Sequence, residues 1–397
     1  MQTLLLVGVG RMGRPYLAAA RRLGLRVCAV ELPERAATIT GQVDDIMPCR
    51  GESDELWAEA ASAAARRCRP DAVVAFSEPH VLAAALVQDE LGLPGPSLRA
   101  AVLSRNKALQ RGRFAAAGVG QPDYLVTDRL PDARAWASAE LPVVVKPLSS
   151  AGSAGVEHVP DIAAYDEMAG RRNGEGRLLV ERAVTGPEYS WEALVQNGRV
   201  WFANLTAKET TGPPHFVEVA HRTSAGVDDA SQALVTDLGT AVLDALGMRT
   251  GIVHLELRLT PSGPAVMEVA VRTPGDYLMD LLGLGYGVDW FELVIRAALG
   301  WELPAPPHGP VRYAASYLPV SPAGTVAGVD GLAEVRAQPC VVDVAVTVST
   351  GDVLLPARSS SQRVGHVVLA APDREELDAA LEKVRRTLVV SVRTGGE

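Results

Sequence analysis

A single lysine followed by a run of small residues is the stretch of this sequence best suited to hold phosphate. The β-branched residues Val143–Val145 predict a short buried strand that ends at Lys146. Residues 149–155 are serine, alanine and glycine, so their backbone N–H groups can approach phosphate oxygens without side-chain bulk in the way. Lys146 would add a positive charge beside them. The alternative is a lysine that merely ends a strand before a flexible hairpin, and these residues alone favour neither.

Two glutamates further along the chain have a spacing that could hold a metal ion. If residues 251–272 form a hairpin whose turn is centred on Ser262, Glu256 lies directly opposite Glu268. Two carboxylates in a cross-strand pair repel each other unless a cation lies between them, and hard oxygen ligands suit Mg²⁺. The alternative is that Arg258 and Arg272 neutralise the two glutamates at an exposed edge.

The N-terminal region has the spacing of a dinucleotide-binding turn. A strand over 3–9 leads into a glycine pattern formed by Gly8, Gly10 and Gly13, and a helix, a second strand and Glu31 follow. This order is typical of NAD-binding domains, with the acidic residue on the ribose. The alternative is a glycine turn that packs the first helix of any doubly wound domain.

Glu78 follows a predicted strand over 71–76, and ligands of open α/β sheets bind beyond the carboxyl ends of strands. We therefore regard Glu78 as a candidate binding residue. The alternative is a carboxylate at a helix N-terminus.

The elements that must position these residues alternate between strands and helices, which predicts the α/β class. Other strands are expected over 26–30, 124–127, 178–180 and in a hairpin of 189–195 with 199–205. Helices are expected over 54–67, 97–117, 229–246, 276–283, 288–299 and 374–388. Residues 208–221 are expected to form a polar loop, and residues 304–310 a linker.

Composition excludes several classes of protein. With 397 residues the chain should hold roughly two or three domains, and 48% hydrophobic with 21% charged residues is ordinary for a globular protein. The net charge of −9 disfavours nucleic acid or an anionic membrane as a partner. No apolar run approaches the ~20 residues that span a bilayer, and no leader segment is recognisable. The four cysteines show neither metal spacing nor a disulfide pattern, which favours a cytoplasmic location.

Taken in order, these motifs resemble the ATP-grasp superfamily of carboxylate–amine ligases from the N-terminus to about residue 290. The resemblance implies an α/β ATP-grasp fold with a Rossmann-like N-terminal domain, and ATP with Mg²⁺ or Mn²⁺ as cofactors. Its regions would be 1–96, 97–205 with the glycine-rich lid, and 206–397 with the metal carboxylates. The superfamily pattern assigns nucleotide contacts to Lys107, Lys146, Ser149, Ser153, Gly155, Glu181, Val184, Glu188 and Lys208, and metal binding to Glu256 and Glu268.

Within the superfamily, two segments resemble the L-amino-acid ligases that form dipeptides, of the bacilysin synthetase and carnosine synthase type. Residues 216–221 (Phe-Val-Glu-Val-Ala-His) and 268–275 (Glu-Val-Ala-Val-Arg-Thr-Pro-Gly) match signatures of that branch. Many ATP-grasp enzymes have asparagine where this chain has Ala270, which leaves the number of metal ions open. Asp276 and Tyr277, where side-chain pockets would be shaped, do not specify the substrate.

The resemblance implies an ADP-forming ligase that joins an amino-acid carboxylate to an amine through an acyl phosphate. Lys146, Arg272 and His221 would be catalytic, while Glu78, Glu218, His221 and Arg272 would bind the substrates. The glycines at 8, 10 and 13 would then shape the fold without binding NAD. The alternatives are another ATP-grasp ligase or carboxylase, an NAD-dependent oxidoreductase, and a noncatalytic nucleotide-binding protein. A homodimer acting on small amino acids or amines is the family expectation.

Overall fold

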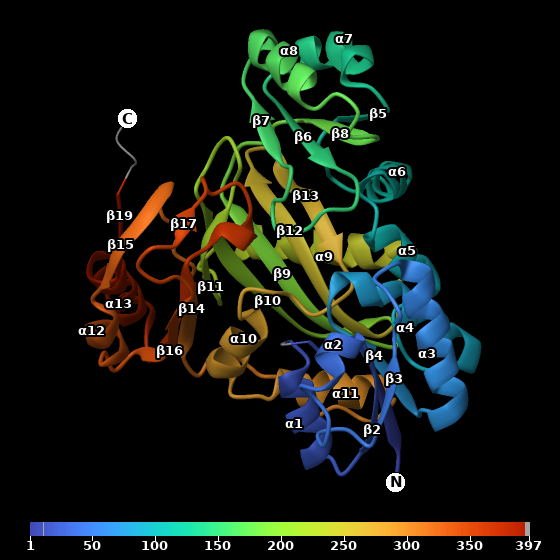
Figure 1. Ribbon diagram of the computed structural model, residues 1–397. Helices are drawn as coiled ribbons and strands as arrows, with labels where there is room; N and C mark the ends of the chain where they lie inside the picture. The colour runs from blue at the N-terminus through green and yellow to red at the C-terminus, as the bar shows by residue number, and fades with distance from the viewer. Residues whose placement is uncertain (11, 394–397) are drawn as a thin grey trace.

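The computed structural model describes residues 1–10 and 12–393, and it has the predicted α/β architecture (Figure 1). Its strands form two four-stranded sheets, one eight-stranded sheet and one three-stranded sheet. The eight-stranded sheet lies at the centre of the molecule (Figure 1). Around it lie the N-terminal region (residues 1–96), an upper lobe (residues 124–182) and a C-terminal lobe (residues 313–393), three of whose strands continue the sheet.

The N-terminal sheet is parallel, in the order β3-β2-β1-β4. Leu4, Leu5 and Leu6 on β1 are fully buried, because helices cover both faces of a parallel sheet. The strands are β1 (Thr3–Val7), β2 (Arg26–Glu31), β3 (Asp45–Pro48) and β4 (Ala72–Ala75). The helices are α1 (Arg14–Arg22), α2 (Pro33–Ala36), α3 (Asp54–Cys68) and α4 (Val81–Leu91), with the short turn η1 (Glu78–His80) after β4.

The single helix predicted over 97–117 is wrong, since two helices occupy this stretch. They are α5 (Leu98–Ser104) and α6 (Lys107–Ala117). The side chain of Asn106 accepts hydrogen bonds from the backbone N–H groups of Ala108 and Leu109, so it caps a new helix N-terminus. The break places Lys107 in the first turn of α6.

The upper lobe carries the glycine-rich loop. Its antiparallel sheet has the order β5-β8-β6-β7, and two helices pack on it (Figure 1). The elements are β5 (Tyr124–Thr127), α7 (Leu130–Glu140), β6 (Val143–Pro147), β7 (Glu157–Val159), α8 (Ile162–Arg171) and β8 (Leu178–Arg182).

The central sheet joins residues far apart in the sequence, in the order β13-β12-β9-β10-β11-β14-β18-β16. The sheet spans the predicted boundary between regions 97–205 and 206–397, because β10 runs across this boundary and pairs with both β9 and β11. It also includes strands from the last 85 residues. The strands are β9 (Glu188–Gln196), β10 (Arg199–Thr210), β11 (Glu218–Arg222), β12 (Gly251–Thr260), β13 (Gly263–Ala270), β14 (Tyr313–Tyr317), β16 (Val341–Val346) and β18 (Gly365–Ala371).

The polar loop predicted over 208–221 is shorter than expected. Lys208 lies within β10, and Glu218 and His221 lie on β11, where Lys208 is paired with His221. Their polar side chains line a cavity, so the period-two signal of a half-buried strand is absent from the sequence. Because these residues lie on paired strands, their side chains are held more rigidly than they would be on a loop.

The predicted pairing of Glu256 with Glu268 is confirmed, although the turn differs from the expected one. The tight turn pairs Thr260 with Gly263, which by itself would put Met267 opposite Glu256. A register shift between Glu256 and Leu257 adds one residue to the return strand and brings Glu268 into place.

The remaining elements complete the C-terminal part. Helix α9 (Asp229–Leu246) packs beneath the central sheet and occupies the predicted range, and the three-stranded sheet has the order β17-β15-β19. The other elements are α10 (Leu278–Tyr286), α11 (Trp290–Ala298), β15 (Gly324–Asp330), α12 (Leu332–Arg336), β17 (Val353–Leu354), η2 (Ser360–Gln362), α13 (Arg374–Thr387) and β19 (Val389–Arg393). No helix among residues 1–10 and 12–393 has the length and apolar character to cross a bilayer. All four cysteines are buried and unpaired.

Candidate active site

A cavity of about 680 Å³ lies where the N-terminal sheet, the upper lobe and the central sheet meet. Every site residue predicted from the sequence lines it, except Ser149 and Gly155. The carbonyl of Gly155 accepts a hydrogen bond from Arg172 in the upper lobe. The fold therefore gathers residues from positions 78 to 272 into one volume.

Lys146 belongs to a buried ion cluster. Its Nζ lies 2.5 Å from Oε2 of Glu181, while Arg111 Nε donates to the other oxygen of the same carboxylate. Burial raises the pKa of Glu181, but the charges of Arg111 and Lys146 outweigh it and the net pKa is lowered. Both oxygens of Glu181 are thus engaged in holding cations, and Arg111 is a site residue that the sequence reasoning missed.

Lys107 links the glycine-rich loop to one of the paired glutamates. Its Nζ lies 2.9 Å from Oε1 of Glu268 and donates to the carbonyl of Ser150 at 2.6 Å. The side chain is 6% exposed. Lys107 is therefore a cation of the site and not a solvated surface lysine.

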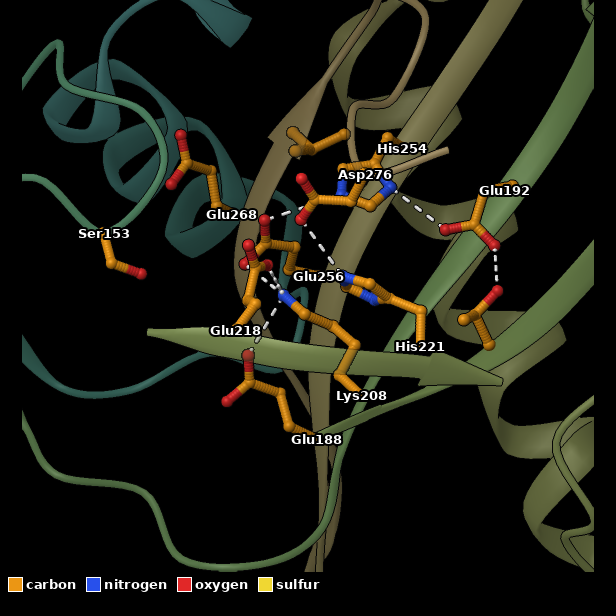
Figure 2. Close-up of polar contacts among 12 residues, drawn as sticks. Ser153, Glu188, Glu192, Lys208, Glu218, His221, His254, Glu256, Glu268 and Asp276 are labelled. Carbon is orange, nitrogen blue, oxygen red and sulfur yellow. Dashed lines mark hydrogen bonds and ion pairs between the residues drawn. The ribbon is translucent and has the colours of Figure 1, made fainter. Parts of the chain in front are cut away.

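Lys208 lies among three carboxylates at the centre of the site (Figure 2). Its Nζ is 2.7 Å from Glu218, 3.0 Å from Glu256 and 3.1 Å from Glu188. Burial lowers the pKa of Lys208, but the three glutamates together raise it well above its ordinary value. Lys208 therefore remains charged.

The paired glutamates are neutralised by lysines, and not by the arginines of the alternative interpretation. Arg258 pairs with Glu188 at 2.6 Å and Arg272 with Glu78 at 2.8 Å, which contradicts the alternative of an arginine-neutralised edge. Burial raises the pKa of Glu256, but Lys208 and His254 outweigh it and the net pKa lies well below its usual value. A carboxylate pair facing a cavity fits the oxygen ligands that Mg²⁺ prefers.

His254 is a second site residue that the sequence reasoning left without a role. Its Nδ1 lies 3.0 Å from the fully buried carboxylate of Glu192, and its Nε2 lies 3.5 Å from Glu256 (Figure 2). Burial lowers the pKa of His254, but the two glutamates raise it to about 9. Thr206 and Asn204 donate to the other oxygen of Glu192 and fix its orientation.

Glu78 and Arg272 form the part of the site nearest the N-terminal sheet. Arg272 Nε donates to Glu78 Oε2 at 2.8 Å, and Arg105 donates to the Glu78 backbone carbonyl at 2.7 Å. The pair is partly exposed to the cavity, and therefore presents one carboxylate and one guanidinium to a ligand.

His221 lies next to Lys208 across β10 and β11 and belongs to a cluster that lines the same cavity. Its Nε2 lies 3.1 Å from Asp276, and Asp276 forms a bidentate pair with Arg363, which also contacts Glu218. Burial raises the pKa of Asp276, but His221 and Arg363 lower it well below its ordinary value. Arg363 comes from the C-terminal lobe, and no motif around it marks it in the sequence.

The glycine-rich loop is anchored at two adjacent residues in its middle, Gly152 and Ser153. Ser153 Oγ donates to the carbonyl of Phe216 at 3.1 Å, and the backbone N–H of Ser360 donates to the carbonyl of Gly152 at 3.0 Å. The loop is therefore held over the cavity by the connection between β10 and β11 and by Ser360 of the C-terminal lobe.

The N-terminal glycine turn is occupied by protein groups. Glu31 is buried, and its Oε2 accepts hydrogen bonds from the backbone N–H groups of Val9 and Gly10, each at 2.8 Å. Gly8 has a φ of +72°, and a Cβ there would lie 1.9 Å from the ring of His80. Both features serve the packing of this turn.

Three parts of the sequence match known families. Residues 17–95 match the ATP-grasp N-terminal domain, residues 139–280 the ATP-grasp domain, and residues 316–393 the L-amino acid ligase C-terminal domain 2. Together with the fold, these matches show an ATP-grasp domain preceded by an ATP-grasp N-terminal domain. The match over residues 316–393 makes the chain similar to the L-amino acid ligases.

Individual proteins are also similar to this chain. An L-amino acid ligase structure from Bacillus licheniformis superposes with a TM-score of 0.84 at 24% identity, covering 99% of each chain. Carnosine synthase 1 of Gallus gallus is 29% identical over 327 residues, which are 75% of this chain and 35% of that protein. An uncharacterized protein of Sinorhizobium fredii is 30% identical over 308 residues, 76% of this chain and 64% of that protein. The chain thus spans less than two thirds of these two relatives.

Purine-pathway enzymes are also similar. A formate-dependent phosphoribosylglycinamide formyltransferase of Stutzerimonas stutzeri is 28% identical over 403 residues, which are 96% of this chain and 94% of that protein.

Proposed function

We propose that this protein forms an amide bond between the carboxylate of an amino acid and an amine, with hydrolysis of ATP to ADP and phosphate. The observation that carries the proposal is the pairing of Glu78 with Arg272 in the same cavity as the cations Lys107, Lys146 and Lys208. A carboxylate beside a guanidinium is complementary to the ammonium and carboxylate of an α-amino acid. The match to the L-amino acid ligase C-terminal domain supports the same conclusion.

In the first half-reaction, the donor carboxylate attacks the γ-phosphate of ATP and gives an acyl phosphate. Glu78 would hold the donor ammonium and Arg272 its carboxylate, or the phosphoryl group as it moves. Lys146, with Lys107 and Lys208, would offset the negative charge of the phosphates. Glu181 contributes by keeping the charged Lys146 oriented into the cavity.

Glu256 and Glu268 would hold Mg²⁺, which when bound supplies charge neutralisation at the phosphate oxygens. Lys208 and Lys107 lie against these carboxylates in the described structure and keep them from repelling each other. Val184 would contact the adenine and Glu188 the ribose, as the superfamily pattern implies.

In the second half-reaction, an amine displaces the phosphate. Glu218 would orient the amine, and His221 with Arg272 would stabilise the oxyanion of the tetrahedral intermediate. The expectations of a homodimer and of a cytoplasmic location stay predictions.

A panel assay tests the proposal. Phosphate release is measured for all pairs of the twenty protein L-amino acids, with and without Mg²⁺. We expect release above background that needs ATP, Mg²⁺ and at least one amino acid, with a dipeptide product by mass spectrometry. Absence of release with every pair would contradict the proposal.

A second candidate is ligation or carboxylation of a substrate that is not an amino acid, which the similarity to the formyltransferase favours. Formate and bicarbonate are therefore included as donors. Release that depends on either one and on no amino acid would support this candidate instead.

A further inference from the structure

Arg363 extends from the C-terminal lobe, and its guanidinium binds two residues that line the cavity, Asp276 and Glu218. Nη1 and Nη2 form a bidentate pair with Asp276 at 2.5 and 2.9 Å. Nη2 also donates to Glu218 Oε2 at 3.0 Å, and Nε to the Glu218 backbone carbonyl at 2.9 Å. The side chain is 10% exposed, so the arginine is a fixed part of the site.

Without this arginine the two carboxylates would face each other with little to hold them. Ligand atoms of Glu218, His221 and Asp276 all lie within 4.8 Å of one another. Lys208 balances Glu218, whereas Arg363 and His221 balance Asp276. Asp276 is also held by a strained turn, since Asp276 and Tyr277 have φ values of +57° and +65°.

The C-terminal lobe supports that turn at two points. Arg363 binds Asp276, and the ring of Tyr277 stacks on His366 at 4.3 Å with its hydroxyl 2.9 Å from His366 Nδ1. The same lobe contacts the glycine-rich loop through Ser360. One short segment, residues 360–366, therefore reaches both the phosphate side and the Asp276 side of the cavity.

Asp276 and Arg272, which pairs with Glu78, lie at opposite ends of one short stretch of chain. Arg272 contacts Glu78 at one end, and four residues later Asp276 contacts His221 on β11. His221 Nδ1 has no hydrogen-bond partner among residues 1–10 and 12–393, although the side chain is buried. An imidazole whose Nε2 is bonded to a carboxylate and whose Nδ1 is free suits the acceptance of a proton.

We propose that Arg363 is a positioning residue for the acceptor amine, holding Asp276 and Glu218 where they receive its ammonium group beside His221. This inference rests on the proposed amide-forming function and names the part of the site that takes the second substrate. Each carboxylate oxygen can accept more than one hydrogen bond, so the oxygens already bonded to Arg363 can still accept the N–H groups of an ammonium.

The reaction at this position is the attack of the acceptor amine on the acyl phosphate. The ammonium releases one proton to His221, whose imidazolium Asp276 stabilises. The amine nitrogen then attacks the carbonyl carbon of the acyl phosphate, a C–N bond forms, and the C–O bond to phosphate breaks as phosphate leaves with the electron pair. A second proton leaves the nitrogen to solvent as the amide forms.

Hydroxylamine separates the two halves of the reaction. It is small and largely uncharged at neutral pH, so it can trap the acyl phosphate as a hydroxamate without needing an ammonium site. Wild type is first tested with each of the twenty protein L-amino acids and hydroxylamine, then with amino-acid acceptors. If wild type forms neither hydroxamate nor dipeptide with any donor, the proposed function fails and Arg363 is not at issue.

The test compares Arg363→Gln with Arg358→Gln, a control at an exposed arginine five residues earlier. For Arg363→Gln we expect KM for the amino-acid acceptor to rise at least about tenfold, while hydroxamate formation stays within about twofold of wild type. Arg358→Gln should leave both unchanged. Equal losses with both acceptors, or no loss with either, would overturn the inference.

Arg363→Lys extends the test if the glutamine variant does not fold by circular dichroism. Lysine keeps the charge but lacks the planar fork that binds two carboxylates. The ratio of dipeptide to hydroxamate formation should fall at least about threefold. An unchanged ratio would count against the positioning role.

Discussion

Replacing Glu268 by glutamine should stop turnover while leaving the fold intact. Glutamine keeps the shape of the side chain but removes the charge that faces Lys107 Nζ at 2.9 Å. The Glu268 side chain is 30% exposed, so the lost ion pair should cost only about 1 kcal/mol of folding stability. The catalytic cost should be larger, because the carboxylate acts on charge that develops at the phosphates. Loss of one such group typically lowers kcat roughly 10²–10³-fold, or about 3–4 kcal/mol.

The assay is ADP release coupled to NADH oxidation, measured over a Mg²⁺ titration. Glu209→Gln is the matched control, because Glu209 is adjacent to Lys208 on β10 but pairs with Arg385 and Arg222. Neighbouring strand residues point to opposite faces, so this variant loses a comparable ion pair on the other side of the sheet. We expect Glu209→Gln to keep turnover within about twofold. A folded Glu268→Gln protein with wild-type turnover at saturating Mg²⁺ would refute the metal assignment.

Three further predictions concern other parts of the chain. His221→Ala should slow amide formation about tenfold, with a smaller effect on acyl-phosphate trapping by hydroxylamine, and an unimpaired amide-forming rate would show that the histidine is not needed. Burial, with Arg35 and Arg105 nearby, lowers the pKa of His80 from 6.5 to about 4, so only the unfolded chain gains a proton as pH falls through this window. The free energy of unfolding should therefore fall by up to about 3 kcal/mol between pH 6.5 and pH 4 in wild type and in His308→Gln, a control at an exposed histidine. Denaturation at a series of pH values measures this, and the prediction is contradicted if the free energy of unfolding of His80→Gln depends on pH as steeply as that of wild type. NADH fluorescence should show no saturable change, because the backbone of the glycine turn already holds Glu31, and saturable binding would restore the oxidoreductase alternative.

The sequence alone determined the fold class and the pieces of the site that follow local rules. The strand 143–146, the helix 229–246 and the hairpin of 189–195 with 199–205 were all recognisable, because strand composition, helix periodicity and turn chemistry act over a few residues. The order of lysines and glutamates along the chain identified the ATP-grasp class, since each belongs to a short motif.

Some local features were misread because a weak signal competed with a stronger one. Alanine-rich sequence on both sides of Asn106 predicted one helix, but the asparagine side chain caps a second helix and turns Lys107 toward the cavity. The register shift that puts Glu268 opposite Glu256 has no signature in the sequence, since it depends on how two strands meet.

Only the tertiary structure decided which charges neutralise each other. Arg111 reaches Glu181 across 70 positions and Arg363 reaches Glu218 across 145, and no spacing rule connects them. Lysines, and not the nearby Arg258 and Arg272, neutralise the paired glutamates. A charge in a half-buried cavity must be paired to offset its desolvation, but the partner can come from any segment that the fold brings near. The residue types and their chemistry are therefore local properties of the sequence, whereas the ion pairs that orient them are set by the packing of three distant segments around one cavity.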